Sequence, residues 1–91
     1  MPPRYHVQLG TKRTTVSLAE TLADLLALQL NQPPHTPEAH TAVRAWLQRQ
    51  LEADNDPYRA RVSQWLQGQV ILALVDKKLS DAYGDWLLGL S

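Results

Sequence analysis

The 91-residue chain has no cysteine, only four glycines and no acidic residue before position 20. The lack of cysteine excludes a disulfide scaffold, a thiolate metal site and a cysteine nucleophile. The glycines are scattered along the chain and form no phosphate-binding loop. No apolar run reaches the ~18 residues of a membrane-spanning helix, and the amino terminus lacks the apolar core of a signal peptide. We therefore expect a cytoplasmic protein with no membrane partner.

Residue types that carry catalysis are equally sparse. The three histidines are His6, His35 and His40, and the last two are five positions apart rather than at the i, i+4 spacing of a helical zinc motif. We recognise no G-x-S-x-G motif and no carboxylate pair in the sequence. We expect no enzyme, no cofactor and no metal site, and we interpret His35 as a solvated loop residue.

The net charge is zero, but the charges are unevenly distributed. Residues 1–19 carry a charge of +3 from Arg4, Lys12 and Arg13, while the rest of the chain sums to −3. A basic patch on a neutral body is the electrostatic footprint of a nucleic-acid contact. Because this patch is small, non-specific affinity for DNA should be weak and sensitive to salt.

Residues 13–18 alternate between two faces with the period of a half-buried strand. The apolar face carries Thr14, Val16 and Leu18, and the polar face carries Arg13, Thr15 and Ser17. A lone strand leaves both edges unpaired, so this strand needs a partner. Side chains of the polar set hydrogen-bond base edges, and the DNA major groove admits a two-stranded β-ribbon.

The segment before this strand has two interpretations. Tyr5, Val7 and Leu9 also alternate with polar residues, and Gly10-Thr11 is a turn signal, so residues 5–18 are compatible with a hairpin. The same segment is also compatible with a flexible arm that brings Arg4 along the phosphate backbone.

Two helices are predicted after the strand. The first carries leucines at helical spacing: Leu18, Leu22, Leu25, Leu26 and Leu30. Ser17-Leu18-Ala19-Glu20 matches a capping box, which would occupy the Ser17 hydroxyl. Thr36 followed by Pro37 marks the start of the second helix, since threonine caps helices and proline suits their first position. The apolar face of that helix comprises Ala39, Val43, Trp46, Leu47 and Leu51.

The order strand, helix, turn, helix over residues 12–52 resembles the ribbon-helix-helix family of Arc-, MetJ- and CopG-type repressors. The resemblance rests on residues 13–18, on the helix start at Ala19-Glu20, and on the stripe Ala39, Val43 and Leu47. In that family two chains pair their strands antiparallel, the outward residues of the ribbon read bases, and the second helices pack together.

The resemblance implies a homodimer on double-stranded DNA. The implied DNA-binding residues are Arg13, Thr15 and Ser17, with Lys12 and Arg4 beside them; the implied dimer core is Val16, Leu18, Leu22, Val43 and Leu47. The start of the second helix normally contacts a phosphate through backbone N–H groups. Here Pro37 has no N–H and Glu38 adds negative charge, so this sequence departs from the pattern. Thr36 and His35 are left as the candidate phosphate contacts.

The C-terminal third lies outside the resemblance. Asp56-Pro57 predicts the start of a third helix, residues 70–75 are apolar all round and favour a buried helix over a strand, and Ser80-Asp81 predicts a last short helix. These helices either cap the core, with Trp46, Trp65 and Trp86 packing across elements, or form a surface for a second protein.

Together these patterns predict a mostly α protein: a ribbon-helix-helix dimer with a short N-terminal strand or hairpin and extra C-terminal helices. Residues 1–11 would be an arm or extra strand, 12–52 the core, and 57–91 a helical extension. We expect a repressor-like, sequence-specific transcriptional regulator that acts as a homodimer. The alternative is an antitoxin-like or adaptor module that binds a partner protein through residues 57–91.

Overall fold

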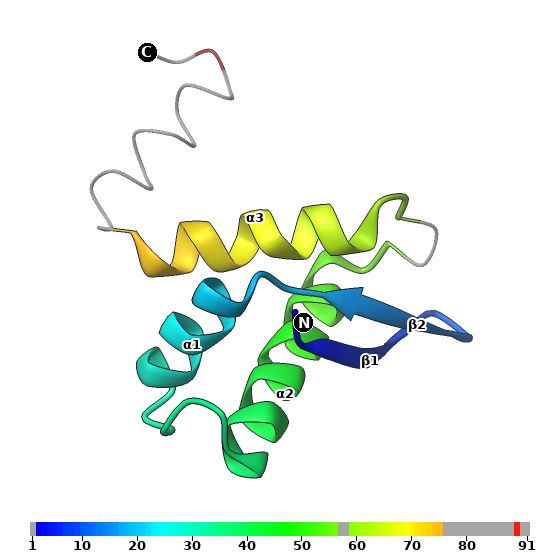
Figure 1. Ribbon diagram of the computed structural model, residues 1–91. Coiled ribbons are helices and arrows are strands. Elements are labelled where there is room, and N and C mark those ends of the chain that lie inside the picture. Colours follow the sequence, from blue (N-terminus) through cyan, green and yellow to red (C-terminus); the bar gives the residue numbers. More distant parts are fainter. Residues whose placement is uncertain (1, 57–58, 76–88, 90–91) are drawn as a thin grey trace.

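The computed structural model describes residues 2–56, 59–75 and 89, which form a β-hairpin and three helices. The elements follow the order β1 (Arg4–Leu9), β2 (Lys12–Ser17), α1 (Glu20–Gln29), α2 (Pro37–Asp54) and α3 (Val62–Leu74). Figure 1 shows the hairpin projecting to one side, α1 and α2 below, and α3 running across the top of both α1 and the hairpin. None of the helices in this part of the chain combines the length and the apolar character that crossing a bilayer requires.

The hairpin pairs β1 with β2 antiparallel, in a register that places Arg4 opposite Ser17 and Leu9 opposite Lys12. Gly10 supplies the positive φ of 63° that the tight turn requires. The hairpin interpretation of residues 5–18 is therefore confirmed. The partner strand that β2 needs comes from its own chain.

One face of the hairpin lies on the helices and forms part of the hydrophobic core. Tyr5, Val7, Val16 and Leu18 are all buried there. From the helices, the core residues are Ala23, Leu26, Ala27, Ala39, Val43, Leu47, Leu51, Leu66 and Val70. Every second side chain of the strands thus packs against the apolar faces of the helices in one shared core.

Helix α1 begins at Glu20, and the predicted capping box is wrong. Ala19 occupies the N-cap position without a side-chain hydrogen bond, and Ser17 belongs to β2. The backbone N–H of Ser17 donates to the Ser63 hydroxyl of α3 at 3.3 Å. Leu25 is 46% exposed although the leucine pattern placed it on the core side, because it lies about 100° around the helix from the buried Leu26.

Helix α2 begins as predicted. The Thr36 hydroxyl accepts a hydrogen bond from the Ala39 N–H at 3.1 Å, and Pro37 occupies the first turn. The buried residues recur every fourth position: Ala39, Val43, Leu47 and Leu51. Trp46 packs partly buried against this core. At the other end, Asn55 ends the helix in the left-handed conformation, with φ 54°.

Helix α3 begins at Val62, several residues later than the Asp56-Pro57 signal predicted. Two features oppose an earlier start. The backbone of Arg61 is in the left-handed conformation, with φ 53°. The Arg59 guanidinium donates two hydrogen bonds, of 2.6 and 2.7 Å, to the Asp54 carboxylate. The Arg59 guanidinium also lies 4.3 Å from the ring centroid of Trp65.

The body of α3 packs on the core. Leu66 and Val70 are fully buried, and Trp65 packs partly buried against them, so the helical interpretation of residues 70–74 is confirmed. Ile71 is 43% exposed, so the apolar run at residues 70–75 is not buried on every side. The predicted helix from Ser80, with Trp86, lies outside the described residues.

Candidate nucleic-acid interface

The second face of the hairpin is polar and exposed along its whole length. Six side chains make up this outer ribbon face: Arg4, His6 and Gln8 on β1, and Arg13, Thr15 and Ser17 on β2. The alternation that buries Tyr5, Val7 and Val16 turns these six outward. Since residues 2–19 contain no acidic side chain, this face combines hydrogen-bonding groups with positive charge.

Cross-strand neighbours on the outer ribbon face form three pairs. Gln8 lies opposite Arg13, His6 opposite Thr15, and Arg4 opposite Ser17. The His6 Nδ1 and Thr15 Oγ1 atoms share a hydrogen bond of 3.1 Å in the middle pair. An arginine therefore stands toward each end of the face, on opposite strands.

Side chains of α2 fix the outer edge of β1. The Gln48 side chain accepts a hydrogen bond from the Gln8 N–H at 2.8 Å and donates one to the Gln8 carbonyl at 3.1 Å. Nearby, His40 Nε2 donates to the Arg4 carbonyl at 3.1 Å. These contacts satisfy backbone groups much as a third strand would, and they hold the ribbon rigidly on the helical body.

A basic groove of about 790 Å³ runs along the other edge, between β2 and the start of α3. Lys12 and Arg13 line it from β2, and Arg59 and Arg61 line it from the segment that precedes α3. The hydrogen bond to Asp54 is the main reason why the pKa of Arg59 is raised above its usual range, so this side chain remains cationic within its ion pair. Arg61 and Lys12 are exposed and form no ion pair with the described residues.

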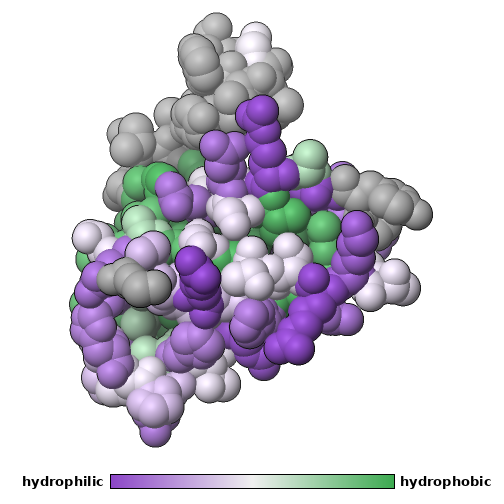
Figure 2. Space-filling view, turned by 45° about the vertical axis from the view of Figure 1, so that its right-hand side comes forward, coloured by the Kyte–Doolittle hydropathy of each residue, from purple (hydrophilic) through white to green (hydrophobic). Residues whose placement is uncertain are grey.

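The groove and the outer ribbon face share Arg13 and Thr15, so they form one continuous surface. Figure 2 brings the hairpin side of the molecule forward and shows hydrophilic and near-neutral residues over most of the lower part of this view. Apolar atoms appear there mainly in the gaps between them. Such a surface favours contact with a polar, negatively charged partner.

Two groups of predicted residues lie elsewhere. The Thr36 hydroxyl caps α2 and also donates to the Pro33 carbonyl at 2.8 Å, and it lines a pocket beside Tyr5, whose ring belongs to the inner side of the hairpin. The structure therefore does not bring Thr36 to the outer ribbon face. The residues assigned to a dimer core are already covered within one chain: Val16, Leu18, Val43 and Leu47 are buried, and Leu22 is half-buried. Their burial requires no second copy, and dimerisation stays a prediction.

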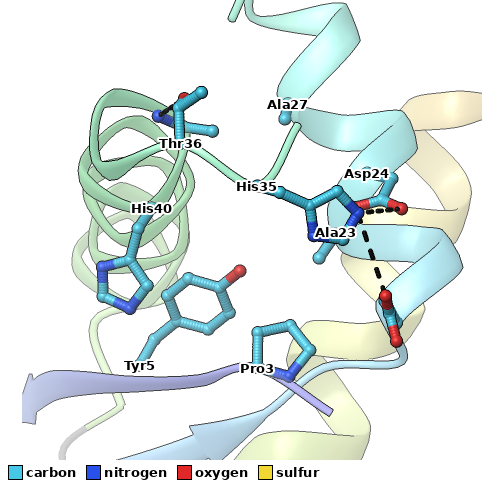
Figure 3. Close-up of a pocket in the computed structure, with 10 residues that line it drawn as sticks. Pro3, Tyr5, Ala23, Asp24, Ala27, His35, Thr36 and His40 are labelled. Carbon is cyan, nitrogen blue, oxygen red and sulfur yellow. Dashed lines mark hydrogen bonds and ion pairs between the residues drawn. The ribbon is translucent and has the colours of Figure 1, made fainter. Parts of the chain in front are cut away.

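The pocket beside Tyr5 contains a cluster of ionisable side chains that was not predicted from the sequence. His35 Nε2 lies 3.2 Å from Asp24 Oδ2 and 3.8 Å from Glu20 Oε1. Figure 3 shows the His35 ring, Asp24 and the Tyr5 ring around this pocket, which measures about 170 Å³. The signal in the sequence was the i, i+4 spacing of Glu20 and Asp24, which places both carboxylates on one face of α1.

Tyr5 connects this pocket to the core. Its ring stacks on the His40 imidazole, with centroids 4.7 Å apart and planes 23° from parallel. Burial, and then the negative charge of Asp24, raise the pKa of the Tyr5 hydroxyl above its ordinary value of 10.0. The hydroxyl therefore stays protonated at neutral pH and remains able to donate a hydrogen bond.

The chain matches no protein-family model, no curated protein and no solved structure. Its function is therefore inferred from the geometry and charge of the sites themselves. The outer ribbon face and the basic groove provide hydrogen-bonding groups and positive charge on an extended, rigidly supported surface. Such a surface is suited to binding another molecule.

Proposed function

We propose that this protein is a sequence-specific DNA-binding transcriptional regulator whose outer ribbon face enters the major groove. The observation that carries the proposal is a two-stranded ribbon with one face in the core and the other formed by six exposed polar side chains, free of acids. A major groove about 12 Å wide admits such a ribbon. The residue types present are those that hydrogen-bond base edges.

The roles of the side chains follow from their chemistry. Arg13 and Arg4 suit bidentate contacts with guanine, Gln8 suits adenine, and the hydroxyls of Thr15 and Ser17 pair with either a donor or an acceptor. Lys12 and Arg61 line the basic groove beside β2, where a phosphate backbone would pass. Base contacts would specify the sequence, and these flanking cations would position the duplex.

The support given by α2 favours recognition over a general attraction to anions. Because Gln48 and His40 bind backbone groups of β1, the ribbon is held in one conformation before any duplex arrives. Preorganisation lowers the entropic cost of binding.

We propose that the protein acts as a homodimer and represses by occupying its operator. A strand of six residues spans about 20 Å, so a single ribbon reads only a short stretch of duplex, and two copies would double the length read. The ribbon-helix-helix resemblance implies one ribbon shared between two chains. In this protein each chain supplies both strands of its own ribbon.

The experiment is a binding-site selection from random duplexes, followed by anisotropy titrations of the selected operator with two variants. Arg13→Ala should weaken binding about 5- to 150-fold, the equivalent of about 1–3 kcal/mol, and relax the base preference at one position. Arg49→Ala, on the exposed side of α2, removes the same charge outside the ribbon and should have a much smaller effect. Equal affinities for Arg13→Ala and the parent would overturn the proposal.

The second candidate function, an adaptor that binds a protein partner, has one observation in its favour. Three large apolar side chains are exposed on neighbouring helices: Leu25 at 46% and Leu28 at 57% on α1, and Ile71 at 43% on α3. A photo-crosslinker at position 28 should then give a specific protein adduct in cells, whereas one at exposed Glu38 should not. Adducts that do not differ between the two positions would count against this function.

A further inference from the structure

The cluster of Glu20, Asp24 and His35 is separate from the proposed DNA surface and lies over the pocket beside Tyr5. We propose that these three residues bind a divalent transition-metal ion of the zinc type, with one coordination position left for water. This proposal departs from the expectation of no metal site, which rested on the lack of cysteine, on the spacing of the histidines and on the lack of a recognised carboxylate pair.

The ligand atoms are positioned by two different elements. Glu20 and Asp24 project from the first turns of α1, one helical turn apart, and His35 reaches them from the loop before α2. The three ligand atoms lie within 4.8 Å of one another. Tetrahedral zinc with bonds of about 2.0–2.2 Å separates its ligands by about 3.4 Å, and the distances from the His35 nitrogen to the two carboxylates are 3.2 and 3.8 Å.

The types of donor favour zinc over the common hard cations. Calcium and magnesium select six or more oxygen ligands, whereas one imidazole nitrogen with two carboxylate oxygens suits zinc and its neighbours in the first transition series. The side chains of Glu20 and His35 are 58% and 64% exposed, so they are free to make the small rotations that would draw the ligand atoms together.

Tyr5 is the independent observation that points to a ligand. The residue is only 3% exposed, and no hydrogen bond joins its hydroxyl to the described residues. Since no fully buried side-chain atom in this part of the chain lacks a partner, the hydroxyl is accessible from the pocket. That hydroxyl points into the pocket next to the cluster (Figure 3). A pocket of about 170 Å³ has room for water, and a metal-bound water there would be a hydrogen-bond partner for the Tyr5 hydroxyl.

The competing account is a plain ion pair between protonated His35 and the two carboxylates, and titration calorimetry with zinc alone distinguishes the two. The full chain should bind one zinc ion near neutral pH. His35→Ala and Asp24→Asn should each weaken that binding at least about tenfold. His6→Ala is the matched control, because His6 lies on the outer ribbon face, and it should bind zinc like the parent. A parent chain that takes up no zinc, or a His35→Ala chain that binds it equally well, would overturn the proposal.

Two further measurements remain decisive if a variant folds poorly. In the parent protein, zinc should shift the imidazole nitrogen resonances of His35 and leave those of His6 in place; the reverse pattern would refute the site. Tyr5→Phe removes only the hydroxyl and should weaken zinc binding severalfold while preserving the far-ultraviolet circular dichroism spectrum. Unchanged affinity in this variant would contradict the role given to the pocket water.

Discussion

At the scale of single residues, Tyr5 shows how neighbouring positions in one strand serve different purposes. Its ring is buried and stacked on His40, while Arg4 and His6 on either side point outward on the ribbon face. The period of two in a strand is sufficient to separate these roles. The core, the pocket and the proposed DNA surface therefore meet within three consecutive residues.

Tyr5 also makes stability depend on pH in the alkaline range. Its pKa is raised above 10.0 in the folded protein, mainly by burial and then by Asp24. A raised folded pKa means that the contribution of Tyr5 is fully present below the unfolded pKa and is lost as pH rises from that value through the folded one. Between about pH 9 and 11 the urea midpoint of the parent should fall further than that of Tyr5→Phe. Parallel falls in the two proteins would show that Tyr5 ionises alike in both states.

At the scale of elements, short sequence patterns correctly predicted those strands, turns and helix starts that depend on contacts between neighbouring residues. Alternation over residues 5–18 and the Gly10-Thr11 turn indicated the hairpin, and the Thr36-Pro37 pair fixed the start of α2. The Asp56-Pro57 pair matches the pattern of a helix start equally well, yet α3 begins at Val62. Just before α3, Arg59 is bound by Asp54 and stacked on Trp65, and Arg61 has a positive φ of 53°. Such contacts are not visible in a helix-start pattern.

For the candidate site too, the sequence predicted only the features that depend on local patterns. Alternation alone placed Arg13, Thr15 and Ser17 on one exposed face. The support of β1 by Gln48 joins residues 40 positions apart, and the basic groove depends on where α3 packs. The missed pocket cluster likewise needed the loop that brings His35 back to α1. Contacts between distant segments depend on tertiary packing, which periodicity does not encode.

Two substitutions in α3 test how much this helix contributes to the stability of the core. Leu66→Ala removes a fully buried side chain and should cost about 2–5 kcal/mol of unfolding free energy. Ile71→Ala, at a position 43% exposed, should cost much less. Urea denaturation followed by circular dichroism measures both. If Leu66→Ala is as stable as Ile71→Ala, then residues 62–74 do not contribute to the core.

At the scale of the whole molecule, a chain of zero net charge concentrates its positive charge around one ribbon. Arg4, Lys12, Arg13 and Arg61 lie on the hairpin or beside it, while the acids of the described chain all lie at or beyond residue 20. Few phosphate contacts are therefore available, so the specificity of the proposed complex would depend mainly on contacts with bases.

Assembly is predicted to be separable from folding. Since each chain pairs β1 with β2 and buries Val16 and Leu18 by itself, diluting the proposed dimer should dissociate it without loss of helix. Sedimentation velocity and circular dichroism across the same concentration series test this. Loss of helical signal in step with dissociation would show that folding and dimerisation are one event, as in a ribbon shared between two chains.

The most direct test of the central claim is an NMR titration of the parent protein with its selected operator duplex. If the outer ribbon face reads DNA, the amide and side-chain signals of Arg4, His6, Gln8, Arg13, Thr15 and Ser17 should shift at one protein-to-site stoichiometry. Signals from the exposed side of α2, such as that of Arg49, should stay in place. Shifts confined to the helices, with the hairpin signals unchanged, would contradict the account.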